Sequence, residues 1–377
     1  MKKIQMVDLI SQYKEIKPSV DKAIETVLNN ATFINGPEVN EFKTNLQEYL
    51  NVKHVIPCAN GTDALQISLM ALGLKPGDEV ITPSFTYIAT TEVIALLNLK
   101  PIFVDVDKET FCLDSKKIEE AITPYTKAIV PVHLYGQAAN MNEILEIAKK
   151  HKLFVVEDNA QAIGSDYKLN NGEIVKTGTL GDIGCTSFFP SKNLGCYGDG
   201  GALFTNNDEL ASTIKKIANH GQSIKYYHDI VGCNSRLDSI QAAVLNIKLQ
   251  KLDEYIESRR IVANFYDNAF SNIKEVITPF RSNDSKHVFH QYTLILDGPD
   301  RDKLHKSLAD YNVPSMIYYP VPAHRQKMFQ EFNSKELDLP VTDWLTKRVI
   351  SLPIHTEMEV DQLTHICTSF IKSLDKT

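Results

Sequence analysis

Residues 187–205 read SFFPSKNLGCYGDGGALFT and place a lysine, Lys192, in a glycine-dense turn between two apolar runs. This pattern predicts a strand, a tight loop and a second strand. A lysine held among backbone atoms is desolvated, loses its proton more readily and can then attack a carbonyl carbon. A solvent-exposed lysine on a hairpin is the commoner outcome for such a stretch. The motif alone therefore does not establish a catalytic role for Lys192, and that role depends on the other motifs of the chain.

Short β-branched runs alternate with helical patterns upstream of this motif. Apolar strands separated by helices are typical of a sheet covered on both faces, so we predict an α/β fold with a mostly parallel, seven-stranded sheet. The loop around Lys192 is too short for the helical crossover that parallel neighbours need, so the last strand should run antiparallel. Ligands bind at the carboxyl ends of the strands in such sheets. The expected strands are 54–58, 79–82, 101–106, 128–133, 154–157, 183–188 and 202–205.

Helical spacing of apolar residues extends on both sides of the sheet region. It predicts helices at 18–29 and 37–50 before the sheet and a long helix at 237–257 after it. We expect a large α/β domain over residues 1–250 and a smaller α+β domain over residues 251–377. The elements expected in the smaller domain are helices at 258–271, 301–311 and 359–373 and strands near 289–296, 314–318 and 349–352.

Composition narrows the classes of protein that the chain can be. With 377 residues, 43% hydrophobic and 23% charged, it resembles a globular protein with a large core. A net charge of -7 argues against a nucleic-acid binder. The start, MKKIQMVDLISQYKEI, lacks the apolar segment of a secretory signal, and no run is long enough to span a membrane, so we expect a cytoplasmic location. The six cysteines have no metal-binding spacing, so we expect free thiols and no metal site.

Polar residues follow the first two predicted strands. Asn60-Gly61-Thr62-Asp63 opens a helix, where backbone N–H groups and a hydroxyl suit an anion, although an ordinary helix cap shows the same pattern. Tyr87 lies in PSFTY after the second strand. Its ring could cover a flat ligand ring or pack in the core.

Two further polar groups lie later in the chain. Asp158, in VVEDNAQAIGS, ends a buried apolar strand, where a carboxylate needs a cationic or protonated partner. A protonated pyridine nitrogen would be such a partner, and capping of the following helix is the alternative. GCNSRLD contains Arg236, a residue type that binds carboxylate or phosphate. With Lys192, these groups supply what pyridoxal phosphate requires: a Schiff-base lysine, an acidic partner for the ring nitrogen and a phosphate site.

Eight motifs occur in the order found in one known family. They are NGTDAL (60–65), GDEVITPSFTYIAT (77–90), PIFVDVD (101–107), PVHLYGQ (131–137), VVEDNAQAIGS (155–165), SFFPSKNLGCYGDGGALFT (187–205), GCNSRLDSIQAA (232–243) and YYPVPAHRQ (318–326). The set resembles the DegT/DnrJ/EryC1/StrS family of nucleotide-sugar aminotransferases. This resemblance implies the fold type I of pyridoxal-phosphate enzymes, which is aspartate-aminotransferase-like, and a homodimer with active sites at the subunit interface.

The resemblance also implies roles for the residues around the cofactor ring. Lys192 is expected to bind pyridoxal 5'-phosphate as a Schiff base and to carry the proton between the two carbons of the 1,3-prototropic shift. Asp158 is expected to keep the pyridine nitrogen protonated. Gln161 is expected to hydrogen-bond the ring hydroxyl, and Tyr87 to stack on the ring.

The remaining expected roles concern the phosphate and the substrate. The backbone at Gly61 and the hydroxyls of Thr62 and Ser187 are expected to hold the phosphate, with Asn234 reaching it from the partner subunit. Two candidate substrate contacts complete the implied site, namely Arg236 and His324.

The implied reaction is a transamination. L-Glutamate leaves its amino group as pyridoxamine phosphate, which then aminates a keto sugar linked to a nucleotide. The motifs around Lys192 and Asn234 are most similar to the branch that aminates C3 of 3-keto sugars of the UDP-2-acetamido-3-oxo-glucuronate type, in surface polysaccharide (lipopolysaccharide or O-antigen) biosynthesis. The alternatives are a dTDP-3-keto-6-deoxyhexose aminotransferase, a 4-keto-sugar aminotransferase, a dehydratase or other lyase, and a non-catalytic regulatory member. The presence of Lys192 and Asp158 favours transamination.

Overall fold

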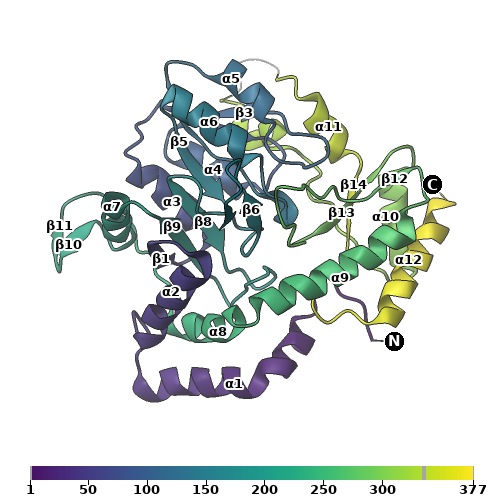
Figure 1. The fold of residues 1–377 in the computed structure, drawn as a ribbon, viewed down its shortest axis with the longest axis horizontal. Helices are drawn as coiled ribbons and strands as arrows, with labels where there is room; N and C mark the ends of the chain where they lie inside the picture. Colours follow the sequence, from purple (N-terminus) through teal and green to yellow (C-terminus); the bar gives the residue numbers. More distant parts are fainter. Residues whose placement is uncertain (1, 333–336, 377) are drawn as a thin grey trace.

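The computed structural model describes residues 2–332 and 337–376. A seven-stranded sheet of order β1-β9-β8-β5-β4-β2-β3 lies at its centre (Figure 1). β9 is antiparallel to both of its neighbours and every other pair is parallel, so the predicted sheet and its antiparallel last strand are confirmed. The strands are β1 (His54–Cys58), β2 (Glu79–Pro83), β3 (Lys100–Val104), β4 (Thr126–Ile129), β5 (Phe154–Asp158), β8 (Ile183–Ser187) and β9 (Gly201–Thr205).

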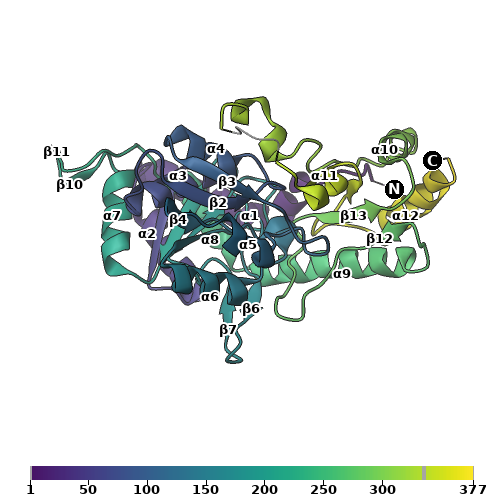
Figure 2. The ribbon, with the colours of Figure 1, turned by 90° about the horizontal axis from the view of Figure 1, so that it is seen from above.

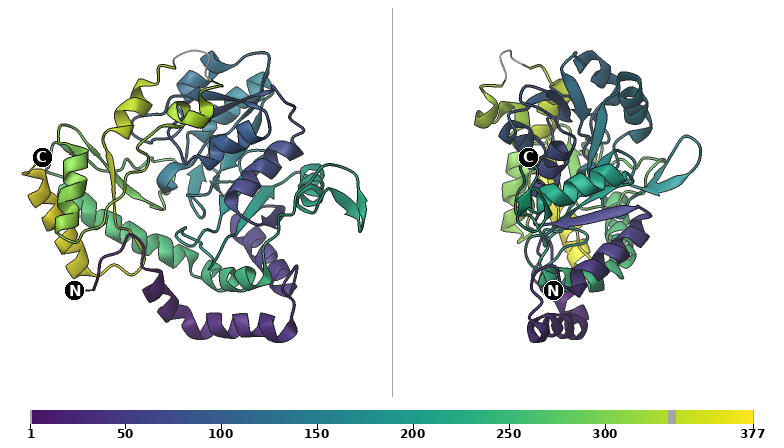
Figure 3. Two further views of the ribbon diagram at one scale, coloured as in Figure 1. Left: turned by 180° about the vertical axis from the view of Figure 1, so that it is seen from behind. Right: turned by 90° about the vertical axis from the view of Figure 1, so that its left-hand side faces the viewer.

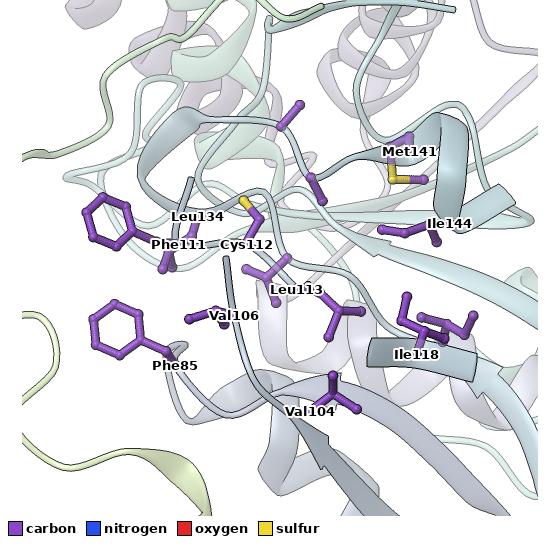
Figure 4. Close-up of a cluster of buried hydrophobic side chains, with 14 of the residues drawn as sticks. Phe85, Val104, Val106, Phe111, Cys112, Leu113, Ile118, Leu134, Met141 and Ile144 are labelled. Carbon is purple, nitrogen blue, oxygen red and sulfur yellow. The ribbon is translucent and has the colours of Figure 1, made fainter. Parts of the chain in front are cut away.

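Both faces of this sheet are buried under helices. Val155 and Val156 of β5 are both buried but belong to clusters on opposite faces, as the two-residue period of a strand requires. The cluster that contains Val155 also packs Phe85 and Leu134 (Figure 4). Helices α3 (Gly61–Ala71), α4 (Ala89–Leu96) and α7 (Asp208–Ala218) cover one face, and α2 (Pro37–Leu50), α5 (Ile118–Ala121), α6 (Met141–His151) and α8 (Ser239–Leu249) cover the other.

The first helix is longer than its apolar spacing predicted. α1 runs over Leu9–Asn30 rather than 18–29, because the carboxylate of Asp8 accepts the N–H of Ser11 at 3.0 Å and caps an earlier start. Pro18 lies inside this helix. It removes one backbone N–H, but Pro18 is exposed, so the carbonyl left without a partner can be hydrated. α1 lies beside α8 along one edge of the molecule (Figure 3).

The long helix expected at 237–257 is two helices. α8 ends at Leu249, and α9 (Leu252–Phe270) begins after Lys251, whose φ of -108° and ψ of 2° depart from helical values. Both helices bury one apolar face, so the apolar residues keep their helical spacing on either side of the break and do not reveal it. The expectation of one continuous helix, followed by another from residue 258, was therefore wrong.

A second core lies around α9. It joins a three-stranded antiparallel sheet to two further helices. The elements are β12 (Val276–Ile277), β13 (Tyr292–Leu296), β14 (Val349–Leu352), α10 (Arg301–Asp310) and α12 (Val360–Leu374). The strand expected at 314–318 is only a single bridge between Met316 and Ser351, while α11 (Pro340–Thr346) packs Leu345 against the large core. We propose that residues 251–377 form the smaller domain.

Two hairpins project from the large core. They are β6–β7 (Asp166–Lys168 and Ile174–Lys176) and β10–β11 (Gln222–Ile224 and Tyr227–His228). The second one forms the end of the molecule opposite both chain termini (Figure 2). Within the described residues, no helix combines the length and apolar character needed to cross a membrane.

Candidate active site

A cavity of about 690 Å³ opens at the carboxyl edge of the large sheet. Segments that follow β1, β2, β5 and β8 converge on it, because the carboxyl ends of parallel strands share one edge. Most of the predicted site residues line this cavity, namely Gly61, Thr62, Tyr87, Asp158, Gln161, Ser187 and Lys192.

Lys192 lies in the loop between β8 and β9 and keeps part of its surface open to the cavity. Its own N–H donates to the carbonyl of Phe189 at 2.8 Å, and the N–H of Cys196 returns to the carbonyl of Phe188 at 2.8 Å. Burial lowers the pKa of Lys192 from 10.5 to about 8, although the negative charge of Asp158 acts in the opposite direction. A substantial fraction of the amine is therefore uncharged, and able to act as a nucleophile, close to neutral pH.

Asp158 ends β5 and is 5% exposed. Its Oδ2 accepts the hydroxyl of Thr90 at 2.7 Å, and its Oδ1 accepts the N–H of Ala160 at 3.1 Å. Both donors are neutral, so the carboxylate retains the capacity to bind a cationic N–H inside the cavity. Thr90 was not anticipated, because a threonine near a helix start carries no sign of a contact with residue 158.

The start of α3 and the end of β8 form a cradle of donors. Asn60 caps the helix by accepting the N–H of Asp63 at 2.8 Å, and the first N–H groups of a helix have no acceptor within it. A Cβ on Gly61 would lie 2.7 Å from the Cβ of Ser187, so the close approach of the two segments depends on glycine. Thr62 and Ser187, both hydroxyl residues, line the same cavity, and the set suits a phosphate group.

The side-chain amide of Gln161 is held from two sides. Its Oε1 accepts the N–H of Tyr135 at 2.8 Å, and its Nε2 donates to the hydroxyl of Tyr319 at 3.2 Å. Tyr319 lines the cavity, and burial raises the pKa of its phenol. Its ring centre lies 6.2 Å from that of Tyr87, which is 55% exposed. The sequence motif at 318–326 contains Tyr319, but nothing in it indicates contact with a glutamine 158 positions earlier.

His290 is a second cavity residue that the sequence did not reveal. It is 5% exposed, and its Nδ1 has no hydrogen-bond partner in the part of the chain that the structure describes. Burial is the main cause that lowers the pKa of His290 well below 6.5, and the charge of Lys192 adds to it. The side chain is therefore a neutral imidazole beside the cavity lysine.

The other predicted residues lie outside the lining of this cavity. Asn234 is exposed and Arg236 is partly buried. Between them, the hydroxyl of Ser235 donates to Asp63 at 2.6 Å and so holds this segment beside the start of α3. His324 is buried, with its Nδ1 at 2.7 Å from the hydroxyl of Ser84. The expected role of Asn234 requires a second chain, and all three roles remain predictions.

Fold and site together define a class of protein. It is an α/β enzyme with a desolvated lysine and a buried carboxylate at the carboxyl edge of the sheet, beside a helix end suited to phosphate. The sequence profile of the DegT/DnrJ/EryC1/StrS aminotransferase family matches residues 14–371. The chain belongs to this family.

Known relatives and solved structures match this chain over nearly its full length. The UDP-2-acetamido-2-deoxy-3-oxo-D-glucuronate aminotransferase of Pseudomonas aeruginosa is 46% identical over 97% of this chain and 99% of its own. The UDP-N-acetyl-3-dehydro-alpha-D-glucosamine 3-aminotransferase of Acidithiobacillus ferrooxidans is 42% identical over 98% of each chain. The crystal structure of S. venezuelae DesV in complex with a ketimine intermediate matches with a TM-score of 0.94 and 35% identity over 100% of both chains. The fold expected from the sequence is confirmed.

Proposed function

We propose that this protein is a pyridoxal 5'-phosphate-dependent aminotransferase that moves an amino group from L-glutamate to C3 of a 3-keto sugar linked to a nucleotide. One observation supports this proposal more strongly than the others. Lys192, with its pKa lowered to about 8, shares one cavity with the buried carboxylate of Asp158, in a chain of an aminotransferase family. A non-catalytic member would have no need to bury these two groups together.

The donor set of the cavity fits pyridoxal phosphate. Lys192 would bind the cofactor, Asp158 would face the ring nitrogen, and the cradle of Gly61, Thr62 and Ser187 would take the phosphate. When bound, the cofactor supplies a ring that accepts the electrons released at the substrate carbon. The uncharged donors on Asp158 support this fit, because they leave its charge to be matched by a protonated nitrogen.

The protein's own groups supply positioning and proton transfer. Nζ of Lys192 would remove the proton from the amino-acid carbon and deliver it to the carbon on the other side of the amino nitrogen. A base with a pKa near the working pH transfers protons in both directions with little penalty. Thr90 and the N–H of Ala160 fix the orientation of Asp158, and the burial of this carboxylate keeps water away from it.

The choice of sugar rests on the relatives. Two of them are named for 3-oxo or 3-dehydro sugars of UDP, which supports C3 as the aminated carbon and the UDP-2-acetamido-3-oxo-glucuronate type as the substrate. A cavity of about 690 Å³ is within the usual range for a small-molecule site. The product would enter surface polysaccharide biosynthesis. A dTDP-3-keto-6-deoxyhexose is the alternative substrate, and a 4-keto sugar is a weaker one.

We also propose a homodimer with shared active sites in the cytoplasm. Tyr87 and Phe189 line the cavity although 55% and 52% of their surfaces are exposed, which supports a second chain over its mouth. In such a dimer Asn234 would reach the partner's phosphate site, and Arg236 would meet an anionic group of the substrate. His324 would act through the segment that follows Tyr319. All six cysteines are unpaired, as expected in a reducing compartment.

Absorption spectroscopy and mass spectrometry test the proposal. L-Glutamate should bleach the visible absorption of the cofactor-loaded protein, and 2-oxoglutarate should restore it. Lys192→Ala should abolish this response, while Lys251→Ala, at a partly exposed lysine outside the cavity lining, should not. Reverse reactions with 2-oxoglutarate and a panel of UDP- and dTDP-linked amino sugars should show turnover of 3-amino sugars. Turnover of 4-amino sugars alone would contradict the C3 assignment.

A further inference from the structure

A second lysine is buried in the fold and has no part in the proposed chemistry. Lys248, near the end of α8, is 1% exposed. Its ammonium group donates to the carbonyl of Gly195 at 2.8 Å and lies 4.6 Å from the ring centre of Tyr197. Burial lowers its pKa to about 8. Within the described residues, the groups beside this ammonium are the Gly195 carbonyl, the ring face of Tyr197 and the thiol of Cys196, whose pKa is raised by burial, and none of them carries a full charge near neutral pH.

The burial of Lys248 requires a physical explanation. Taking an ammonium group out of water is costly unless a charge or several hydrogen bonds compensate for it. A methionine would fill nearly the same space without this cost. The ammonium group donates a hydrogen bond to the carbonyl of Gly195, and a methionine could not do so.

That carbonyl belongs to the loop that presents the cavity lysine. Gly195 lies three residues after Lys192, and a Cβ on it would stand 2.4 Å from the carbonyl oxygen of Pro190, so the two ends of the turn are in contact. α8 touches the same loop at a second point, where the Oε1 of Gln241 accepts the N–H of Tyr197 at 2.8 Å. Gln241 and Lys248 are two helical turns apart and therefore share one face of α8. The helix holds the loop at both points.

We propose that Lys248 is a positioning residue for the reaction, which fixes the loop through Gly195 and so sets where the Nζ of Lys192 stands in the cavity. The inference rests on the proposed function. A reacting group that is displaced by about 1 Å can lose on the order of 100-fold in rate. The loss of Lys248 therefore acts on the proton-transfer rate rather than on the binding of glutamate.

Three variants separate positioning from general stability. Lys248→Met keeps the length of the side chain and loses the donor, Lys248→Arg keeps a donor, and Leu249→Met is a matched change in the buried core beside it on the same helix. The measurement is the single-turnover reaction of cofactor-saturated protein with L-glutamate, followed by the visible band, together with the pH titration of that band. Cofactor content and thermal unfolding are recorded for each protein.

Lys248→Met should lower the limiting rate by about tenfold or more, leave the apparent affinity for glutamate within about twofold, and move the midpoint of the pH titration. Lys248→Arg should recover most of the rate, and Leu249→Met should match the wild type. If Lys248→Met does not fold, Gln241→Leu removes the other contact of α8 with the loop and should give the same result.

A Lys248→Met protein with the wild-type rate and titration overturns the inference. A loss of rate that equals the loss of bound cofactor, or that lies in glutamate affinity alone, also overturns it. Wild-type protein that does not respond to glutamate would instead defeat the proposed function, so the two failures are distinct.

Discussion

In the cofactor-free protein, Lys192 should titrate far below an ordinary lysine. Burial lowers its pKa from 10.5 to about 8, and the charge of Asp158 limits the fall. At pH 7 a pKa of about 8 leaves about 10% of the amine neutral, whereas a pKa of 10.5 leaves about 0.03%. At equal accessibility and equal reactivity of the neutral amine, Lys192 should therefore react about 300-fold faster at pH 7 than an ordinary lysine. This enhanced reactivity is what capture of a carbonyl compound requires.

Competitive acetylation measures this pKa directly. Cofactor-free protein is treated with limiting acetic anhydride at a series of pH values, and mass spectrometry of peptides quantifies the modification of Lys192. The exposed Lys22 serves as an internal reference in the same digest. Asp158→Asn removes the charge that raises the pKa of Lys192, so the midpoint should move to lower pH.

Two results would refute this account of the site. A midpoint above about 10 would mean that Lys192 is not desolvated in the folded chain. An upward shift in Asp158→Asn would mean that the carboxylate does not act on the amine as an opposite charge.

Three further predictions concern the stability and the cradle. Because folding lowers the pKa of Lys192, its charged form lowers the free energy of unfolding; this effect is complete below pH 8 and disappears as the pH rises towards 10.5. Lys192→Met should therefore raise the free energy of unfolding of the cofactor-free protein in urea by about 1–3 kcal/mol at pH 7. A gain that does not depend on pH would contradict this. Gly61→Ala, which places a Cβ 2.7 Å from that of Ser187, should weaken cofactor binding in equilibrium dialysis by about tenfold, and unchanged affinity would show that the cradle is not rigid. Glu157 is fully buried and accepts three backbone N–H bonds from residues 178–181 as well as contacting His133, so Glu157→Gln should cost about 2–4 kcal/mol in urea unfolding. Wild-type stability would count against the buried acceptor role of Glu157.

The large sheet could be predicted from the sequence because its pattern is local. Each strand is a short apolar run between turns or helices, since both faces of the sheet are covered, and the direction of β9 followed from the length of one loop. The convergence of residues from 61 to 192 also followed, because the carboxyl ends of parallel strands share an edge. The chemistry assigned to them needed the family resemblance.

What could not be predicted depends on contacts between distant residues. The bond from Thr90 to Asp158 and that from Gln161 to Tyr319 join positions 68 and 158 apart in the chain. The break after Leu249 leaves the apolar spacing unchanged, so periodicity could not reveal it. The early start of α1 depended on a single capping carboxylate at Asp8.

The antiparallel direction of β9 restricts how the chain length can vary. The loop that carries Lys192 is a hairpin closed by the pair Ser187 and Gly201, so its two ends cannot move apart. An inserted or deleted residue there would shift the amine or break the ladder, because no crossover helix is present to absorb the change. The tips of the projecting hairpins, at residues 169–173 and 225–226, do not position a residue of the candidate site. Insertions and deletions should therefore accumulate at those tips during evolution, while the spacing between Ser187 and Gly201 stays constant.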